Sequence, residues 1–145
     1  MIQRIQSLFL LLSSASFWVL FAFPFAGSDK PTAAFLADQS YNINDHILLL
    51  VLTVLGGVVG IIALFLFKNR PFQVKTTYFS LIFSILMPIV VVFLFYNEAT
   101  VNAMNVEIDD KLGIYMPIIG LVSSVLAIRF IRKDEKTVRS MDRLR

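Results

Sequence analysis

The stretch ILLLVLTVLGGVVGIIALFLF, residues 47–67, decides the fold of this chain. All of its 21 residues except Thr53 are apolar or glycine, and none is Asp, Glu, Lys, Arg or His. A bilayer core about 30 Å thick is crossed by roughly 20 apolar residues in an α-helix. The stretch therefore predicts a transmembrane helix.

The whole 145-residue chain has the composition of a membrane protein. Hydrophobic residues make up 57% of it and charged residues 16%, whereas a soluble domain has roughly 45–50% and about 25%. This balance excludes an ordinary soluble domain, a disordered chain and a nucleic-acid-binding domain of usual composition. The absence of cysteine excludes a disulfide scaffold and a thiolate metal site.

Three more stretches reach the length of a membrane span: residues 7–26, 77–96 and 112–131, the last uncharged as far as Ile128. The first also resembles a secretory signal, because Arg4 precedes its apolar run. Its length and the position of Pro24 before Gly27 favour a retained helix over a cleaved signal. The sequence therefore predicts an all-α membrane protein with four transmembrane helices in two antiparallel hairpins, forming a single membrane domain over residues 1–145.

Charged residues are sorted between the two sides of this predicted domain. The N-terminal flank, the 68–76 link and the C-terminal residues from Arg129 onward hold eleven Lys and Arg against three Asp and Glu, a net charge of +8. The loops 27–46 and 97–111 hold two Lys against seven Asp and Glu, a net charge of −5. By the positive-inside rule, we expect both termini in the cytoplasm of a bacterium, with the chain crossing the inner membrane.

The connections between the predicted helices indicate how they pack. The 68–76 link contains Pro71, which we expect to end the second helix near Asn69. So short a link makes the second and third helices antiparallel neighbours. The two long loops each contain a short β-like stretch, at 35–43 and 106–108, and these predict a small lid over that end of the domain.

Gly56 and Gly60 form a GxxxG pair within the second predicted helix. Small residues four apart allow two helices to approach closely inside a membrane. The partner helix belongs either to this chain, where serines lie at similar depth, or to a second copy in a homo-oligomer. We favour packing within the chain over dimerisation.

The polar tail, residues 132–145, is expected to continue the fourth helix as a basic cytoplasmic extension. At 100° per residue, six basic side chains share an arc of about 120°, and acidic residues lie on the other side. The six are Arg129, Arg132, Lys133, Lys136, Arg139 and Arg143, and the acidic residues are Asp134, Glu135 and Asp142. Lys68 and Arg70 of the short link lie at the same end and extend this predicted basic surface.

Three interpretations of the basic surface remain open on the residues alone. The first is a topology signal made of solvated charges. The second is contact with anionic membrane lipids, at roughly 1 kcal/mol for each basic residue near the headgroups. The third is docking to an acidic partner, either a protein or an RNA such as that of a membrane-bound ribosome. A long helix carries its charges farther from the lipid than topology requires, which favours a partner.

Residues that could carry catalysis or bind a metal are sparse. His46 is the single histidine, and Asp45 beside it is expected to cap the second helix through its carboxylate. No catalytic triad and no thiol nucleophile can be assembled. Glu107, Asp109 and Asp110 are expected to form an acidic, solvated loop. We therefore expect no enzyme activity, no cofactor and no metal.

Three polar segments resemble those of a known family. They are MIQRIQSLFLLL at the start, FKNRPFQ in the short link and IRKDEKTVRSMDRLR in the tail. Together they resemble a family of small four-helix membrane proteins from the Bacteroidota that is catalogued as a domain of unknown function. The resemblance implies the four-helix architecture, and it supplies no activity, substrate or cofactor.

The expected function is that of a non-catalytic accessory or assembly subunit of a larger inner-membrane complex, such as a translocon, an insertase or a ribosome-linked machine. The alternative is an oligomeric channel or carrier subunit for a neutral solute, assembled through the face that carries Gly56 and Gly60. A third class, a membrane enzyme acting on lipid, would depend on Glu98, His46 and Asp45.

Overall fold

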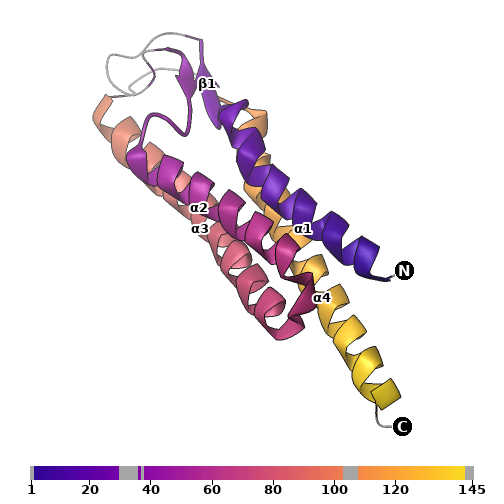
Figure 1. Cartoon of the computed structure of the whole chain (residues 1–145). Helices are drawn as coiled ribbons and strands as arrows, with labels where there is room; N and C mark the ends of the chain where they lie inside the picture. Colours follow the sequence, from indigo (N-terminus) through magenta and orange to yellow (C-terminus); the bar gives the residue numbers. More distant parts are fainter. Residues whose placement is uncertain (1, 30–35, 37, 103–107, 143–145) are drawn as a thin grey trace.

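The computed structural model describes residues 2–29, 36, 38–102 and 108–142, with the backbone alone for 2–4, 98–102 and 139–142. In this part of the chain, long helices run side by side and a small sheet covers one end (Figure 1). The helices are α1 (Ile2–Trp18), α2 (Ile47–Phe65), α3 (Arg70–Asn102) and α4 (Met116–Asp142), with short 3-10 turns η1 (Val19–Phe21), η2 (Leu66–Lys68) and η3 (Leu112–Tyr115). The strands are β1 (Ala26–Ser28), β2 (Ser40–Tyr41) and β3 (Ile108–Asp110).

The helices form an up-and-down bundle. Each helix packs against its neighbours in sequence, and α1 closes the ring by packing along α4. The beginning of α1 and the end of α4 lie at the end of the bundle opposite the sheet (Figure 1). We call the end covered by β1, β2 and β3 the sheet end. The opposite end, made of η2, the first turn of α3 and α4 beyond Ile128, is the basic end.

Three helical segments are long and apolar enough to cross a membrane: Ile47–Lys68, Arg70–Asn97 and Leu112–Val138. A fourth apolar helix, Ile5–Phe21, is shorter. The prediction of a helical protein with membrane-spanning segments is thus confirmed for the described residues. The predicted helix over 7–26 is wrong at its end, because helical structure stops at Phe21.

Pro24 and the sheet explain why the first helix stops early. Proline has no N–H to donate and restricts the residue before it, so a helix does not continue easily through this point. The Phe25 N–H instead donates to the Tyr41 carbonyl at 2.8 Å, and the Phe25 carbonyl accepts from the Lys111 N–H at 3.0 Å. The residues that follow therefore enter the sheet as β1.

The sheet has the order β2-β1-β3, and both pairs are antiparallel. Its outer strands come from the two loops in which the sequence predicts β-like stretches at 35–43 and 106–108. Within the described residues these strands are Ser40–Tyr41 and Ile108–Asp110, and residues 35, 37, 106 and 107 lie outside the described residues. The middle strand, of which the sequence placed Ala26 in a helix and the other two residues in a loop, joins the two outer strands into one lid.

The link between α2 and α3 is shorter than the predicted 68–76, because α3 begins at Arg70 rather than at residue 77. Helical structure ends at Lys68, and Asn69 leaves the helical conformation with φ −120° and ψ 82°. Pro71 lies in the first turn of α3, where its missing N–H is harmless. The Gln73 N–H donates to the Asn69 carbonyl at 2.9 Å. Helices α2 and α3 therefore leave this turn as packed, antiparallel neighbours.

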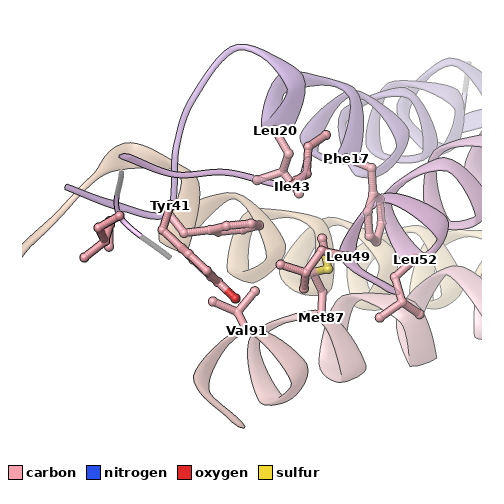
Figure 2. Packing of buried hydrophobic residues seen from close by; sticks show 11 residues of the cluster. Phe17, Leu20, Tyr41, Ile43, Leu49, Leu52, Met87 and Val91 are labelled. Carbon is pink, nitrogen blue, oxygen red and sulfur yellow. The ribbon is translucent and has the colours of Figure 1, made fainter. Parts of the chain in front are cut away.

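The side chains that fill the interior differ along the length of the bundle. Near the sheet end it is apolar, and Phe17, Leu49, Met87 and Val91 pack beneath Tyr41 (Figure 2). Many large apolar side chains point outward instead, such as Phe65 and Phe93, each 68% exposed. An apolar exterior of this kind is what a hydrocarbon solvent requires, since lipid tails are as apolar as the side chains.

Midway along the bundle, hydroxyl groups replace apolar side chains. The Ser13 hydroxyl forms hydrogen bonds with the hydroxyls of Ser124 at 2.7 Å and Ser80 at 3.1 Å. These bonds join α1 to α4 and α3 at positions that are almost fully buried. A membrane bundle gains from such bonds because polar groups have no water to bind in its interior.

The glycines of α2 bring that helix close to α1. Gly56 faces Phe17, and a Cβ atom at Gly60 would lie 2.7 Å from the Cβ of Ser14. The Ser14 hydroxyl donates to the Gly57 carbonyl at 2.8 Å. The pair Gly56 and Gly60 therefore packs inside the chain in this structure.

Candidate functional site

The basic end gathers exposed basic side chains along one face of α4. They are Arg129, Arg132, Lys133 and Lys136, and with exposed Lys68 of η2 we call them the basic surface. Positions three and four apart share a helix face, and α4 continues to Asp142, past the link between α2 and α3 (Figure 1). Of the two remaining predicted residues, the Arg139 side chain and all of Arg143 lie outside the described residues.

An aromatic ring supports one of these cations. The guanidinium of Arg132 lies 5.5 Å from the centroid of the Tyr78 ring on α3. A cation over an aromatic face keeps its charge and gains about 0.5–1 kcal/mol at an exposed site. This contact directs Arg132 along α3 while leaving its charge available to a partner.

Arg70 takes a different position from the one that the sequence predicts. Its Nη2 lies 2.9 Å from Oδ2 of Asp134, and the two side chains are 24% and 13% exposed. Asp134 lies on the side of α4 opposite the basic surface, as its helical position predicts, and that side faces α3. Arg70 therefore joins α3 to α4 rather than extending the basic surface.

At the start of the basic surface, α4 is also held against α1. The Gln6 side-chain amide donates to the Phe130 carbonyl at 3.1 Å. The rings of Phe9 and Phe130 stack with centroids 5.4 Å apart, and Ile131 is fully buried next to them. Contacts from α1 and α3 thus set the direction in which α4 leaves the bundle.

Of the candidate catalytic residues, Asp45 and His46 have described side chains, and both lie at the start of α2. The prediction that Asp45 caps α2 is wrong: His46 is the N-cap residue and makes no side-chain cap hydrogen bond, while the Asp45 carboxylate accepts the Asn42 N–H. Asp45 comes one residue too early, so its carboxylate closes the preceding turn instead. Partial burial raises the pKa of Asp45, against the Asn42 hydrogen bond that lowers it. The Glu98 side chain lies outside the described residues.

The acidic residues at the sheet end are separated by the strand. Asp109 and Asp110 are exposed neighbours in β3 and point to opposite faces of the sheet, while Glu107 lies outside the described residues. Among the residues that the structure describes, no three His, Asp or Glu side chains gather to hold a metal ion.

Sequence reasoning missed two structural relationships. One is the hydroxyl network of Ser13, Ser80 and Ser124, and the other is the pairing of Arg70 with Asp134. A signal for the first was present, because serines recur at similar depth in three apolar stretches. The second has no signal in the sequence, since its partners lie in distant segments.

Comparisons with known proteins place the chain without assigning it an activity. A family model described as a domain of unknown function (DUF4293) matches residues 2–144. No curated protein and no solved structure matches the chain.

Proposed function

The chain belongs to the DUF4293 family, a domain of unknown function, and we propose that it acts as a non-catalytic accessory or assembly subunit of a larger membrane complex. Its basic surface would bind an acidic partner at the membrane face. The observation that carries the proposal is a row of four exposed cations on a helix that projects past its neighbours and is fixed at its root.

The fixed position of the four basic side chains on α4 favours binding to a partner over a plain topology signal. A topology signal needs charge near the membrane and no defined geometry. Here the Arg70–Asp134 pair and the Gln6–Phe130 hydrogen bond hold the base of α4. A fixed helix loses less conformational freedom on binding, and preorganisation of this kind strengthens binding.

We further propose that all four helices span the inner membrane of a bacterium, with both termini in the cytoplasm. The charge difference between the two sides supports this orientation. The segment Ile5–Phe21 has 17 residues, about 26 Å of helix at the usual rise, which is close to the thickness of the hydrocarbon core. Its packing along α2 and α4 supports a position in the same membrane layer.

The proposed partner is acidic. A translocon or an insertase would offer an acidic protein surface, and a membrane-bound ribosome would offer RNA phosphates. Both would attract the basic surface over a Debye length of about 8 Å at physiological salt, and both contacts would weaken as salt is added. Cross-linking followed by separate protein and RNA detection would identify the class.

Affinity purification from mild detergent at native expression tests the proposal. The informative variant is the triple change Arg132→Gln, Lys133→Gln and Lys136→Gln, which leaves eight Lys and Arg on the basic side and preserves the charge difference that sets orientation. The matched control, Arg132→Lys with Lys133→Arg and Lys136→Arg, retains every charge. We expect a stoichiometric partner with the wild type and the control, and its loss with the Gln variant. Recovery of a lone chain from wild-type cells would contradict the proposal.

A channel or carrier subunit remains the second candidate, supported by the buried hydroxyls contributed by α1, α3 and α4. The same hydroxyls weaken it, because they bind one another and are almost fully buried. Proteoliposomes that swell in an osmotic gradient of a neutral solute, and swell less with Ser124→Val, would favour transport over the accessory role.

A further inference from the structure

A pocket opens at the sheet end between the sheet and α3. Its volume is about 170 Å³. Phe25, Ala26, Tyr41 and Val91 form its buried walls, whereas Val92, Tyr96 and Asp110 line it and are exposed. The exposed residues mark its mouth, so the pocket is reached from outside the bundle.

The register of the sheet places one carboxylate on the pocket. Ala26 of β1 pairs with Tyr41 on one side and with Asp110 on the other. Residues directly opposite one another in antiparallel strands share a face of the sheet, so the three form a row that faces α3. Residues on either side of Asp110 alternate to the other face, where the Lys111 side chain packs against Gly27. The charge on the pocket face is therefore negative.

Four aromatic side chains, Phe25, Tyr41, Phe95 and Tyr96, line the pocket beside aliphatic ones. The rings of Tyr41 and Phe95 meet edge to face with centroids 5.5 Å apart, and the rings of Phe25 and Tyr41 lie 6.4 Å apart. The Tyr41 ring extends from the sheet toward Val91 of α3 (Figure 2). Aromatic faces beside a carboxylate are suited to an organic ammonium group, which is attracted both by the ring quadrupoles and by the negative charge.

The volume fits a group of that size. An engineered aliphatic cavity of about 150 Å³ binds benzene or xenon. A pocket of about 170 Å³ therefore accommodates an ethanolammonium or trimethylammonium group and excludes a whole lipid. Any longer ligand has to leave through the mouth.

An exposed apolar stripe on α3 begins at the mouth of the pocket. Ile85, Ile89, Val92 and Tyr96 share one helix face and are 42%, 58%, 47% and 68% exposed. Along the helix they span about 16 Å at the usual rise, which matches a good part of an acyl chain. Val92 and Tyr96 belong both to the stripe and to the pocket, so the two surfaces are continuous.

The position of the pocket along α3 also agrees with binding of a lipid headgroup. Tyr96 lies 21 residues beyond exposed Lys75 on α3, about 32 Å along the helix axis. A hydrocarbon core is about 30 Å thick, and Lys and Tyr side chains prefer its two interfaces. With Lys75 at one interface, the mouth of the pocket lies at the other, where lipid headgroups are found.

We propose that this pocket binds the ammonium headgroup of a membrane phospholipid, with the acyl chain along the α3 stripe. Asp110 accepts the ammonium N–H at the mouth, and Tyr41, Phe95 and Tyr96 surround the cation. The lipid lies at the sheet end, so this site is independent of the basic surface and of any partner there.

Native mass spectrometry of the purified full chain in a neutral maltoside tests this proposal. The probe is phosphatidylethanolamine, and phosphatidylglycerol with the same acyl chains is the lipid without an ammonium group. We expect the wild type to retain one phosphatidylethanolamine at least about tenfold more strongly than phosphatidylglycerol, the loss expected when a charge-assisted hydrogen bond is missing. Free ethanolamine at the same concentration is expected not to displace it, because the chain contributes to binding.

Two variants and two matched controls locate the site. Asp110→Asn removes the carboxylate, and Val92→Trp fills the mouth from an exposed position. Both are expected to lower retention of phosphatidylethanolamine about tenfold. Asp109→Asn on the other face of β3 and Val122→Trp at an exposed position of α4 are expected to leave it unchanged. Equal retention of the two lipids, equal loss with the controls, or displacement by free ethanolamine would each overturn the proposal.

Discussion

Arg70 and Asp134 form an ion pair, with 2.9 Å between Nη2 and Oδ2, although they stand at the start of α3 and near the end of α4. Both side chains are largely enclosed by the bundle. The pair joins the only short link between spanning segments in the described chain to the helix that carries the basic surface.

Removal of one member of this pair is expected to weaken the basic end. Asp134→Ala leaves the Arg70 guanidinium partly buried without its carboxylate, at a cost of about 1–3 kcal/mol, between the values for exposed and buried pairs. Thermal unfolding in a neutral maltoside measures the loss. The exchange of the two residues, Arg70→Asp with Asp134→Arg, is expected to recover part of it. Arg129→Gln, at an exposed position, serves as the control, and equal losses at both sites would contradict the role of the pair.

A larger residue at Gly60 is expected to separate α1 from α2. A Cβ atom there would lie 2.7 Å from Cβ and 3.0 Å from Cα of Ser14, so backbone has to move. Gly60→Leu should therefore destabilise the bundle by about 1–3 kcal/mol, the usual cost of overpacking. Val58→Leu, at an exposed position of the same helix, should change the unfolding midpoint little. A stable Gly60→Leu protein of altered oligomeric state would indicate that this face meets a second copy instead.

The hydroxyl network is expected to contribute modestly and cooperatively. Ser13→Ala removes hydrogen bonds to Ser80 and Ser124, and interhelical bonds in a membrane average about 0.6 kcal/mol. A double-mutant cycle with Ser124→Ala isolates the shared bond. We expect a coupling energy of about 0.5–1 kcal/mol between these two positions, and purely additive losses would show that the bond contributes nothing.

The pKa of Asp45 predicts a weak dependence of stability on pH. Burial raises this pKa above its ordinary value of 3.8, so the folded chain holds its proton to a higher pH than the unfolded chain does. Stability is therefore expected to fall as the pH rises from about that value through the raised pKa, and to be constant above it. Asp45→Asn should lack this decline. An identical pH profile for both proteins would contradict the assignment.

Length and hydropathy were sufficient to locate the helices along the chain, though not to set their ends, because the lipid requires about 20 uninterrupted apolar residues. Periodicity alone was sufficient to place Asp134 opposite the basic surface. The end of the first helix was not predictable in this way. The apolar run continues as far as Ala26, and only with these residues does it reach the length of a membrane span. The conformation of the chain at this point is decided by the hydrogen bonds of the Phe25 backbone to distant residues, in particular to Tyr41.

The basic surface was predicted more completely than the contacts that hold α4 against α1 and α3. Exposure of Arg132 and Lys133 follows from one helix, for which the sequence carries the full geometry. The removal of Arg70 from that surface follows from how α3 and α4 approach each other, which depends on packing throughout the bundle. The sheet-end pocket has the same origin, because its carboxylate comes into line with Tyr41 only through the register of two strand pairs.

The ring order of the bundle has a consequence for its biogenesis. Helix α1 emerges first from the ribosome, yet α4, along which it packs, emerges last. Ser124, one of the two hydrogen-bond partners of Ser13, lies 111 residues downstream. Synthesis at about 5–20 residues per second makes that interval roughly 6 to 22 s. During this time Gly57 of α2 and Ser80 of α3, which bond to Ser14 and Ser13, are already made, and the bond to Ser124 is still missing. The contact between α1 and α4 is therefore the last one of the ring that can form during synthesis.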